Sequence, residues 1–412
     1  MRKDRQQRKA RRLLAAAAGL ALALGAAPAA RASSPVIVCS DGGAGGYEAF
    51  PDVCRMADGR LLAVFYAGYG HVSLPTATWP KGGRISYCTS SDEGQTWSAA
   101  QALFDGPYDD RDPSVTQLSD GRLICTFFTL QPTGGTSWVG LGTFSVTSAD
   151  GGATWSAGPQ QISTNHYCSS PVRELPDGRL ILGLYVQTAT DAWGAVTISG
   201  DGGGTWCEPV AIPNGGLRYE AETDVIRLRD GRLFAALRGS SHSGWSVSSD
   251  GGLSWSVAQL FGFPGHSHYL HRAPGNIVLM AHRNPGVSTS LHYSLDECQT
   301  WSTNVVIDTV TGAYPSMVTL KDGSVLVAYY EEGTGSNIRA KRFRITPAGL
   351  AWLEMNAVTD TSVSWVVPVD TRTQVLSLSE ADALDTRTCT FDWSDEAEVN
   401  TRKRIGLSLL FK

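Results

Sequence analysis

Residues 219–255 read YEAETDVIRLRDGRLFAALRGSSHSGWSVSSDGGLSW and contain two turn signals. The first is Asp230-Gly231, which lies between the apolar segments 225–228 and 232–238. Asp and Gly accept the positive φ that a tight turn requires, so these segments predict a β-hairpin. The second is Ser-x-Asp-x-Gly-x-Ser-Trp, ending at Trp255, whose carboxylate can cap turn N–H groups while the Trp packs between strands. The stretch therefore predicts two antiparallel hairpins, or one four-stranded sheet.

The first hairpin recurs along the chain, and the glycine of its turn marks each copy. There are six such glycines, at Gly59, Gly121, Gly178, Gly231, Gly275 and Gly323. Successive glycines are separated by 62, 57, 53, 44 and 48 residues, which is the spacing of one four-stranded propeller blade each. The sequence therefore predicts an all-β fold, a six-bladed β-propeller of four-stranded antiparallel blades.

The second turn recurs five times at one fixed place in each unit. The copies end at Trp97, Trp155, Trp206, Trp255 and Trp301, and in the last one Cys298 takes the glycine position. These turns resemble the Asp boxes, or BNR repeats, of the sialidase (neuraminidase) superfamily, whose members are six-bladed β-propellers. The resemblance covers about residues 36–345 and implies an enzyme that acts on glycans.

The ends of the repeat region indicate how the ring closes. Residues 338–345 read IRAKRFRI and predict a third strand for blade six, and residues 36–38 (VIV) are its expected partner. We expect the propeller to occupy residues 33–350. Residues 351–412 contain no repeat and are expected to form a C-terminal extension.

Residues 1–32 have the composition of an export signal. A basic leader reaches Arg12, an apolar run covers residues 13–27, and Ala30-Arg31-Ala32 forms an Ala-x-Ala cleavage site. The apolar run is too short to span a bilayer, and no other stretch is a candidate span. We therefore expect a secreted or periplasmic protein.

Composition limits the partners of the mature chain. The leader holds eight of the 34 basic and one of the 39 acidic residues, which leaves a net charge near −12. Such a chain binds nucleic acid poorly. The expected partner is a glycan or glycoconjugate, bound by a monomer without cofactor or metal. All eight Cys lie in the mature part, and because they allow 105 disulfide connectivities the sequence specifies none.

Functional side chains are expected at the ends of the first two strands of each blade, because these ends meet around the central channel. Nine residues before each hairpin glycine stand Phe50, Asp112, Ser169, Glu222, His266 and Tyr314. Seven residues after it stand Tyr66, Phe128, Tyr185, Arg238, His282 and Tyr330, with Arg283 and Glu331 one step beyond. Acidic, basic and aromatic residues in one column predict a binding or catalytic site.

The resemblance assigns roles to two of these residues. Retaining sialidases use a Tyr nucleophile at the start of the inner strand of blade six, and a Glu at the same place in blade four is its base. Tyr314 and Glu222 occupy those positions. A free phenol has a pKa near 10 and needs a neighbouring carboxylate to take its proton, so the pairing is also expected on chemical grounds.

The family binds the substrate carboxylate with three arginines, and here the match is incomplete. Arg238 resembles the blade-four member, whereas the Arg-Ile-Pro motif of blade one is replaced by Ala49-Phe50-Pro51. The blade-five arginine falls where this chain reads Ser288-Thr289-Ser290, with Arg283 nearby but offset. Arg111, in the Arg111-Asp112-Pro113 motif of blade two, can supply a cation from another direction, beside Asp112.

Histidines provide two further candidates. The family's acid/base Asp lies in the blade-one loop, but residues 59–91 contain no Asp, and His71 is the titratable substitute there. His266, His268 and His271 form a cluster in which His-x-His places two imidazoles on one strand face, as in many metal sites. No clear third ligand accompanies them, so His266 is expected to be a polar contact in the central pocket.

Three functions remain open from the sequence. The first is an exported glycoside hydrolase resembling exo-α-sialidases, acting on sialic acid or on a different acidic or deoxy sugar. The second is a propeller-type polysaccharide lyase, in which Tyr314 or a His removes a proton beside a uronate carboxylate held by Arg238. The third is a glycan-binding propeller without catalysis. A lyase leaves an unsaturated sugar that absorbs ultraviolet light, which a hydrolase does not.

Overall fold

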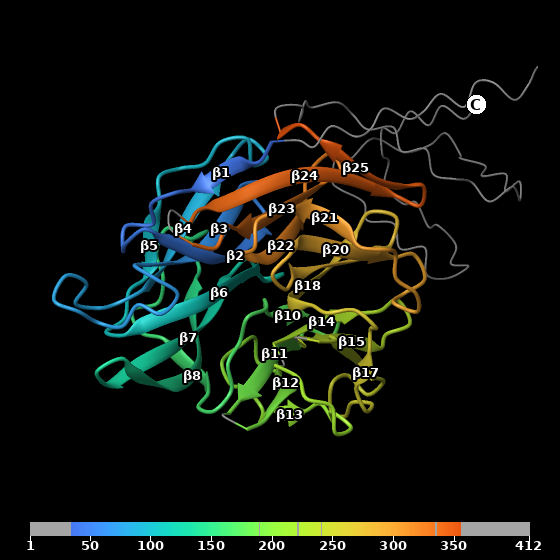
Figure 1. The fold of residues 1–412 in the computed structure, drawn as a ribbon, viewed down its shortest axis with the longest axis horizontal. Helices are drawn as coiled ribbons and strands as arrows, with labels where there is room; N and C mark the ends of the chain where they lie inside the picture. The colour runs from blue at the N-terminus through green and yellow to red at the C-terminus, as the bar shows by residue number, and fades with distance from the viewer. Residues whose placement is uncertain (1–33, 189, 221, 240, 334–335, 356–412) are drawn as a thin grey trace, which may run out of the picture. The chain divides into compact units, whose positions relative to one another are not determined.

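The computed structural model describes residues 34–188, 190–220, 222–239, 241–333 and 336–355. Their strands form six antiparallel sheets that follow one another around a central axis (Figure 1). This confirms the predicted six-bladed β-propeller. The part of the chain described contains no long apolar helix of the kind that crosses a bilayer. The expected signal, residues 1–32, and residues 356–412 of the expected extension lie outside the described residues.

Each of the first five blades consists of four consecutive strands. Blade one contains β2 (Tyr47–Arg55), β3 (Leu61–Gly68), β4 (Arg84–Ser90) and β5 (Gln101–Phe104), and blade two contains β6 (Asp109–Gln117), β7 (Leu123–Gly134), β8 (Ser137–Ser148) and β9 (Gln160–Ser163). Blade three contains β10 (Arg173–Glu174), β11 (Leu180–Gln187), β12 (Ala192–Ser199) and β13 (Val210–Ala211), and blade four contains β14 (Thr223–Arg227), β15 (Leu233–Leu237), β16 (Gly244–Ser248) and β17 (Gln259–Leu260). Blade five contains β18 (His266–Ala273), β19 (Ile277–Asn284), β20 (Ser288–Ser294) and β21 (Val305–Asp308).

Blade six closes the ring with a strand from the beginning of the domain. It contains β22 (Ala313–Thr319), β23 (Val325–Tyr330) and β24 (Ile338–Thr346), and its outer edge is completed by β1 (Val36–Cys39). The register pairs Val36 with Ala340 and Cys39 with Ile338, as the sequence predicts for residues 36–38. A further strand, β25 (Gly349–Leu353), pairs with the other end of β24, so blade six continues past the expected boundary at residue 350.

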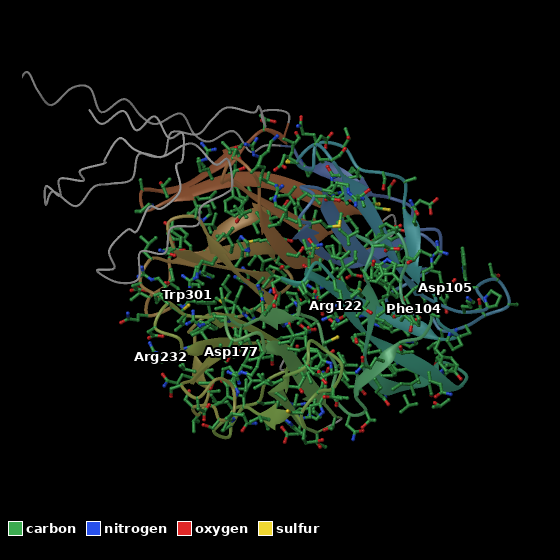
Figure 2. The ribbon with its side chains drawn as sticks, turned by 180° about the vertical axis from the view of Figure 1, so that it is seen from behind. Phe104, Asp105, Arg122, Asp177, Arg232 and Trp301 are labelled. Carbon is green, nitrogen blue, oxygen red and sulfur yellow. The ribbon has the colours of Figure 1, made fainter. Side chains whose placement is uncertain are left out.

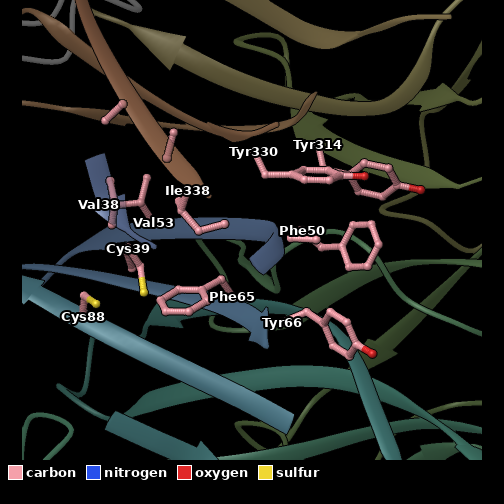
Figure 3. Packing of buried hydrophobic residues seen from close by; sticks show 14 of the residues in the cluster. Val38, Cys39, Phe50, Val53, Phe65, Tyr66, Cys88, Tyr314, Tyr330 and Ile338 are labelled. Carbon is pink, nitrogen blue, oxygen red and sulfur yellow. The ribbon is translucent and has the colours of Figure 1, made fainter. Parts of the chain in front are cut away.

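Apolar side chains between blades form the core. The strand second from the axis is buried along its whole length in blades one and six, because it lies between neighbouring sheets on both faces. Six main clusters of buried apolar side chains follow, one between each pair of neighbouring blades. The cluster between blades six and one is shown in Figure 3. Every pair of neighbouring blades is therefore joined by apolar packing.

All five predicted Asp boxes fold alike. In the second copy, Asp150 Oδ1 accepts the Thr154 N–H at 2.9 Å and Oδ2 accepts the Thr154 hydroxyl at 2.6 Å. The same two bonds, at 2.5–2.9 Å, join the equivalent residues of the other four boxes. Cys298 has φ of 67° at the glycine position, a conformation that favours glycine, yet the fifth box keeps its hydrogen bonds.

The hairpin turns and the Asp boxes lie at the same end of the ring. The arginine after each of three Asp-Gly turns donates to a box carbonyl in the next blade: Arg60 to Gly151 (3.3 Å), Arg122 to Gly202 (3.0 Å) and Arg179 to Gly251 (3.3 Å). Figure 2 shows the ring from behind with Arg122 labelled. The starts of the inner strands consequently meet at the opposite end, where the sequence predicts the site.

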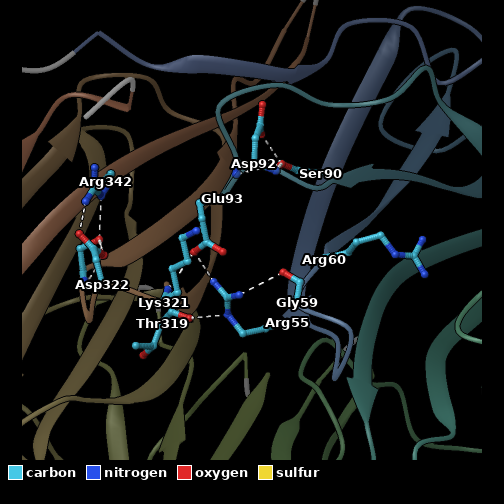
Figure 4. Close-up of polar contacts among 12 residues, drawn as sticks. Arg55, Gly59, Arg60, Ser90, Asp92, Glu93, Thr319, Lys321, Asp322 and Arg342 are labelled. Atoms are coloured by element: carbon cyan, nitrogen blue, oxygen red, sulfur yellow. Dashed lines mark hydrogen bonds and ion pairs between the residues drawn. The ribbon is translucent and has the colours of Figure 1, made fainter. Parts of the chain in front are cut away.

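A polar network completes the contact between blades six and one at this turn-bearing end (Figure 4). Arg55 donates to the carbonyl oxygens of Thr319 and Gly59, both at 3.1 Å, and forms an ion pair with Glu93. Glu93 also accepts the Lys321 N–H at 2.9 Å. Because Glu93 belongs to the first Asp box, this box ties the two terminal blades together.

Candidate active site

Four inner strands begin with an irregularity that directs a side chain to the axis. The pairing register shifts near the starts of β2, β6, β18 and β22. Each shift includes a residue with positive φ, namely Phe50 (54°), Asp112 (48°), Ser267 (49°) and Tyr314 (40°). In three of the four a proline follows, which cannot donate to the strand ladder. Such bulges re-aim side chains and are frequent beside functional sites.

Because of these bulges, one residue of the column predicted by counting back from the hairpin glycines differs in the structure. Phe50, Asp112, Ser169, Ser267 and Tyr314 line a narrow cavity on the axis with room for about one water molecule. Counting back from the hairpin glycine therefore gave the wrong residue in blade five, where His266 was expected. The reason is a shorter turn. Three residues separate the last paired positions of β18 and β19, whereas five residues separate those of β2 and β3, so the hairpin glycine has a different place in the turn of blade five.

Three side chains from blades four and six form a hydrogen-bonded triangle, and one of them, Tyr314, also lines this cavity. The Tyr314 hydroxyl donates to Glu222 Oε1 at 2.7 Å. Arg238 Nη1 donates to the same carboxylate oxygen at 2.6 Å and to Tyr314 Oη at 3.1 Å. Glu222 Oε2 is buried and makes no hydrogen bond to any described residue. The predicted nucleophile and base are thus in direct contact, and Arg238 contacts both.

The surroundings keep the Tyr314 phenol protonated. Burial raises the pKa of Tyr314, and the Glu222 charge raises it further, while Arg238 opposes both effects. Proton loss from Tyr314 therefore requires an acceptor in contact with it, and Glu222 Oε1 is the carboxylate oxygen that receives the Tyr314 hydrogen bond. Arg238 is held in turn by Glu220, whose Oε2 accepts the Arg238 Nε–H at 2.8 Å.

Arg283 approaches Tyr314 from blade five. Its Cζ atom lies 4.9 Å from the centre of the Tyr314 ring, at a distance typical of a cation–π contact. The guanidinium donates to the Gly312 carbonyl at 2.6 Å and to Tyr330 Oη at 2.9 Å. Although Arg283 is offset in sequence, the fold places it beside Tyr314, so Arg238 and Arg283 both contact this residue.

A chain of hydrogen bonds links Arg283 to His71 across blades six and one. The Tyr330 hydroxyl, which accepts from Arg283, donates to Glu332 Oε2 at 2.6 Å. The Tyr47 hydroxyl donates to Glu332 Oε1 at 2.8 Å and lies 3.0 Å from His71 Nδ1. The single hydroxyl hydrogen of Tyr47 is used in the hydrogen bond to Glu332, so Tyr47 Oη can only accept from His71. Nδ1 of neutral His71 therefore carries the ring hydrogen, and Nε2 is a hydrogen-bond acceptor.

The pKa of His71 is lowered to about 4, first by burial and then by the Arg111 charge. Arg111 itself is buried. It donates to the His71 carbonyl oxygen and lies 3.6 Å from Asp109 and 3.8 Å from Asp112. Burial raises the pKa of Asp112 to about 7, with Arg111 opposing and Glu222 adding to the rise. Arg111 therefore supports the His71 loop with a guanidinium that is itself buried.

Phe50 occupies the centre of the site, at the motif where the family's blade-one arginine is absent. Its ring centre lies 4.7 Å from that of Tyr314, 5.3 Å from that of Tyr330 and 5.5 Å from that of His71. Figure 3 shows Phe50 between Tyr314 and Tyr66. An aromatic ring thus replaces a cation and separates Tyr314 from His71.

The remaining histidines lie apart from this cluster, except His266. His266 Nε2 is 3.6 Å from Glu220 Oε2, and burial lowers its pKa to about 4. His268 and His282 stack against each other inside blade five, whereas His271 Nε2 contacts the Thr319 hydroxyl at 2.8 Å. In the described ranges, no group of three or more His, Cys, Asp or Glu side chains is arranged to hold a metal ion.

Three polar residues of the site, Tyr47, Glu220 and Glu332, are not predicted from the sequence. Tyr47 and Glu332 are 285 residues apart and meet only because blade six closes on blade one. Glu220 lies two residues before Glu222, outside the counted column. The column instead named Glu331, which pairs with Arg339. A shift of one residue in the count would have reached Glu332, but no sequence signal favoured it.

Comparison with known proteins identifies the fold. The family model of the BNR repeat-like domain matches residues 111–327, more than half of the chain. A comparison with curated protein sequences gives no match. Similar solved structures include a protein of unknown function from Dyadobacter fermentans, with 21% identity, a TM-score of 0.66, and coverage of 78% of this chain and 100% of that one.

Two further structures are sialidases by name. The intramolecular trans-sialidase of Ruminococcus gnavus, solved with oseltamivir carboxylate, has 15% identity and a TM-score of 0.58, covering 78% of this chain and 99% of its own. The Trypanosoma rangeli sialidase has 15% identity and a TM-score of 0.58, covering 77% of this chain and 60% of its own. At such identities the likeness concerns the fold. The chain belongs to the BNR repeat-like domain family and folds as a six-bladed β-propeller.

Proposed function

We propose that this protein is an exported glycoside hydrolase that removes an acidic sugar from a glycan, with Tyr314 as nucleophile. The observation that carries the proposal is the 2.7 Å hydrogen bond from the Tyr314 hydroxyl to Glu222, bridged by Arg238. A buried phenol that is hydrogen-bonded to a buried carboxylate has a base in contact with it, which can take the phenolic proton when the oxygen attacks. The leader-like residues 1–32 support export, where extracellular glycans are the accessible substrates.

The first half of the reaction uses the Tyr314–Glu222 pair. Tyr314 Oη forms a bond to the anomeric carbon while the bond from that carbon to the leaving oxygen breaks. The phenolic proton passes to Glu222, and a proton donor protonates the leaving oxygen. In the second half water attacks the anomeric carbon and gives one proton to the group that had protonated the leaving oxygen, the bond to Tyr314 breaks, and Glu222 returns its proton to the Tyr314 oxygen. The configuration at the anomeric carbon is therefore retained.

Two arginines are available for a substrate carboxylate. Arg238 and Arg283 both contact Tyr314, and a carboxylate between them would gain charge-assisted hydrogen bonds. Phe50 stands where a third arginine is absent, so one side of the pocket offers an aromatic face to a C–H surface of the sugar. The similar R. gnavus structure is a complex with oseltamivir carboxylate, so a protein with this fold binds a carboxylate ligand. We therefore assign an acidic sugar as the substrate class.

His71 is proposed as the proton donor and acceptor for the leaving oxygen and for water. It lies across Phe50 from Tyr314, and its Nδ1 is held by Tyr47, which leaves Nε2 for the substrate. The pKa of His71 is lowered to about 4, so its protonated form is a stronger acid than an ordinary imidazolium. Only a small fraction of His71 is protonated at neutral pH. The fraction of His71 that is protonated falls about tenfold for each pH unit above this pKa.

This assignment gives a pH-dependent expectation. For an unactivated glycoside, kcat/KM should decrease as the pH rises from about 4 to 7, because less His71 is protonated. An aryl glycoside with a good leaving group needs no proton, so its kcat/KM should vary much less. His71→Asn should lower kcat/KM for the unactivated glycoside by roughly 10²-fold and for the aryl glycoside by less than about tenfold. Equal losses for both substrates would contradict the role of His71 as proton donor.

A substrate screen of the purified mature protein tests the proposal as a whole. Sialosides, rhamnosides and uronate polysaccharides are incubated with the protein, and products are followed by mass spectrometry and by absorbance near the ultraviolet band of unsaturated sugars. A hydrolase releases a saturated acidic sugar. An unsaturated product would establish a lyase instead, and binding without any product would establish a glycan-binding propeller.

A further inference from the structure

Two cysteines lie side by side where the ring closes. Cys39 is the last residue of β1, and Cys88 belongs to β4 of blade one. Both are members of the apolar cluster between blades six and one, with 6% and 0% of their surface exposed. Figure 3 shows their sulfur atoms facing each other. The contact thus joins the closing strand of blade six to the neighbouring blade.

The two thiols interact directly. The neighbouring side chain is the largest influence on each group: Cys88 lowers the pKa of Cys39, and Cys39 raises the pKa of Cys88. The Asp41 backbone N–H also stabilises the Cys39 thiolate. Cys39 is therefore the better nucleophile of the pair, since the thiolate is the species that attacks.

We propose that Cys39 and Cys88 form a disulfide that fastens the closing strand to blade one. Two thiols lose two protons and two electrons, and a low-molecular-weight disulfide such as oxidised glutathione takes up the electrons. Cys39 attacks one glutathione sulfur and releases a glutathione thiol. Cys88 then attacks Cys39 Sγ and releases the second one. The inference is independent of the proposed enzymatic activity.

The position explains what such a bond would do. β1 is four residues long and is held to β24 by three register pairs, from Val36 with Ala340 to Cys39 with Ile338. Among the described strands, β1 and β24 are the neighbours in a sheet that are far apart in the sequence, so separation of this short strand opens the ring there. A bond from Cys39 to Cys88 closes a loop of 50 residues, counted from residue 39 to residue 88, and restricts the unfolded chain accordingly. The ring would then be closed by a covalent bond as well as by strand pairing.

Peptide mapping tests the bond directly. The folded mature protein is incubated in a glutathione redox buffer, free thiols are blocked under denaturing conditions, and the protein is digested without reduction. Trypsin leaves Cys39 and Cys54 on one peptide, so a second cleavage at Asp41 and Asp52 is needed to separate them. The expected product is a cross-linked pair of peptides containing Cys39 and Cys88. Blocked thiols at both residues after prolonged oxidation would overturn the proposal.

A thermal measurement gives a second readout. The apparent Tm of the oxidised protein should exceed that of the reduced protein by about 3–6 °C. Cys39→Ser and Cys88→Ser should each abolish this difference, whatever their own Tm. Cys207→Ser is the matched control, because Cys207 is exposed, and it should keep the full difference. A redox-dependent shift that persists in Cys39→Ser would assign the stabilisation to other cysteines and contradict the proposal.

Discussion

Tyr314→Phe is expected to lower kcat for glycan hydrolysis by at least about 10³-fold, with little change in substrate affinity. The substitution removes one oxygen and keeps the ring that packs on Phe50 and under the Arg283 guanidinium. The lost hydroxyl is the only part of the side chain that bonds to Glu222 and Arg238. Turnover and binding are measured separately, by product release and by titration with a non-hydrolysed sugar acid.

Tyr329→Phe is the matched control for this substitution. Tyr329 is also a buried tyrosine of blade six, but its hydroxyl donates to Asp308 at 2.6 Å and takes no part in the triangle. Its replacement should change kcat by less than about threefold. If Tyr314→Phe kept near-normal turnover of an identified substrate, Tyr314 would be an aromatic residue of the rim, and the chemistry would have to be sought at His266, His71 or Asp112.

Arg238→Ala is expected to weaken binding of acidic sugars by about 1.5–3 kcal/mol, the value of a charge-assisted hydrogen bond. The change also removes the cation that contacts both Glu222 and Tyr314, so kcat should fall as well. The binding loss should be selective, because an isosteric sugar without the carboxylate gains nothing from the guanidinium. Affinities for the acid and for its neutral amide analogue are compared by calorimetry.

Arg232→Ala provides the control for charge. Arg232 is exposed, pairs with Asp230 at 2.7 Å and lies in the hairpin turn at the opposite end of the ring. Its loss changes the net charge equally but should leave both affinities unchanged. An Arg238→Ala protein that bound the acid and the amide with the same loss would show that Arg238 organises the site without holding the substrate anion.

The fold could be read from the sequence because its signals are local and repeated. Asp-Gly turns and Asp boxes specify hairpins by themselves, and their fixed spacing fixes the number of blades. The closing strand could also be predicted from the sequence, since the strand at residues 338–345 of blade six required a partner and residues 36–38 supplied it. The fifth box was recognisable although Cys298 replaces its glycine, because the other hydrogen-bonding residues are retained.

The site could be predicted only in part, because strand register and long separations in the sequence also determine which residues meet there. Tyr314, Glu222 and Arg238 were found because their strands have regular turns, and they meet in one triangle. Counting failed in blade five, where a shorter turn brings Ser267 into the column in place of His266. The links of Tyr47 to Glu332 and of Cys39 to Cys88 join distant segments through packing, which no periodicity encodes.

The central claim is that Tyr314 forms a covalent bond to the sugar, and trapping tests it most directly. The protein is incubated with a fluorinated acidic sugar fluoride, which forms a glycosyl–enzyme intermediate quickly and releases it slowly, and the labelled peptide is sequenced by mass spectrometry. We expect one sugar per protein, attached to Tyr314, and no label in Tyr314→Phe. Turnover of the same donor with the label on another residue, or with no covalent label at all, would contradict the account.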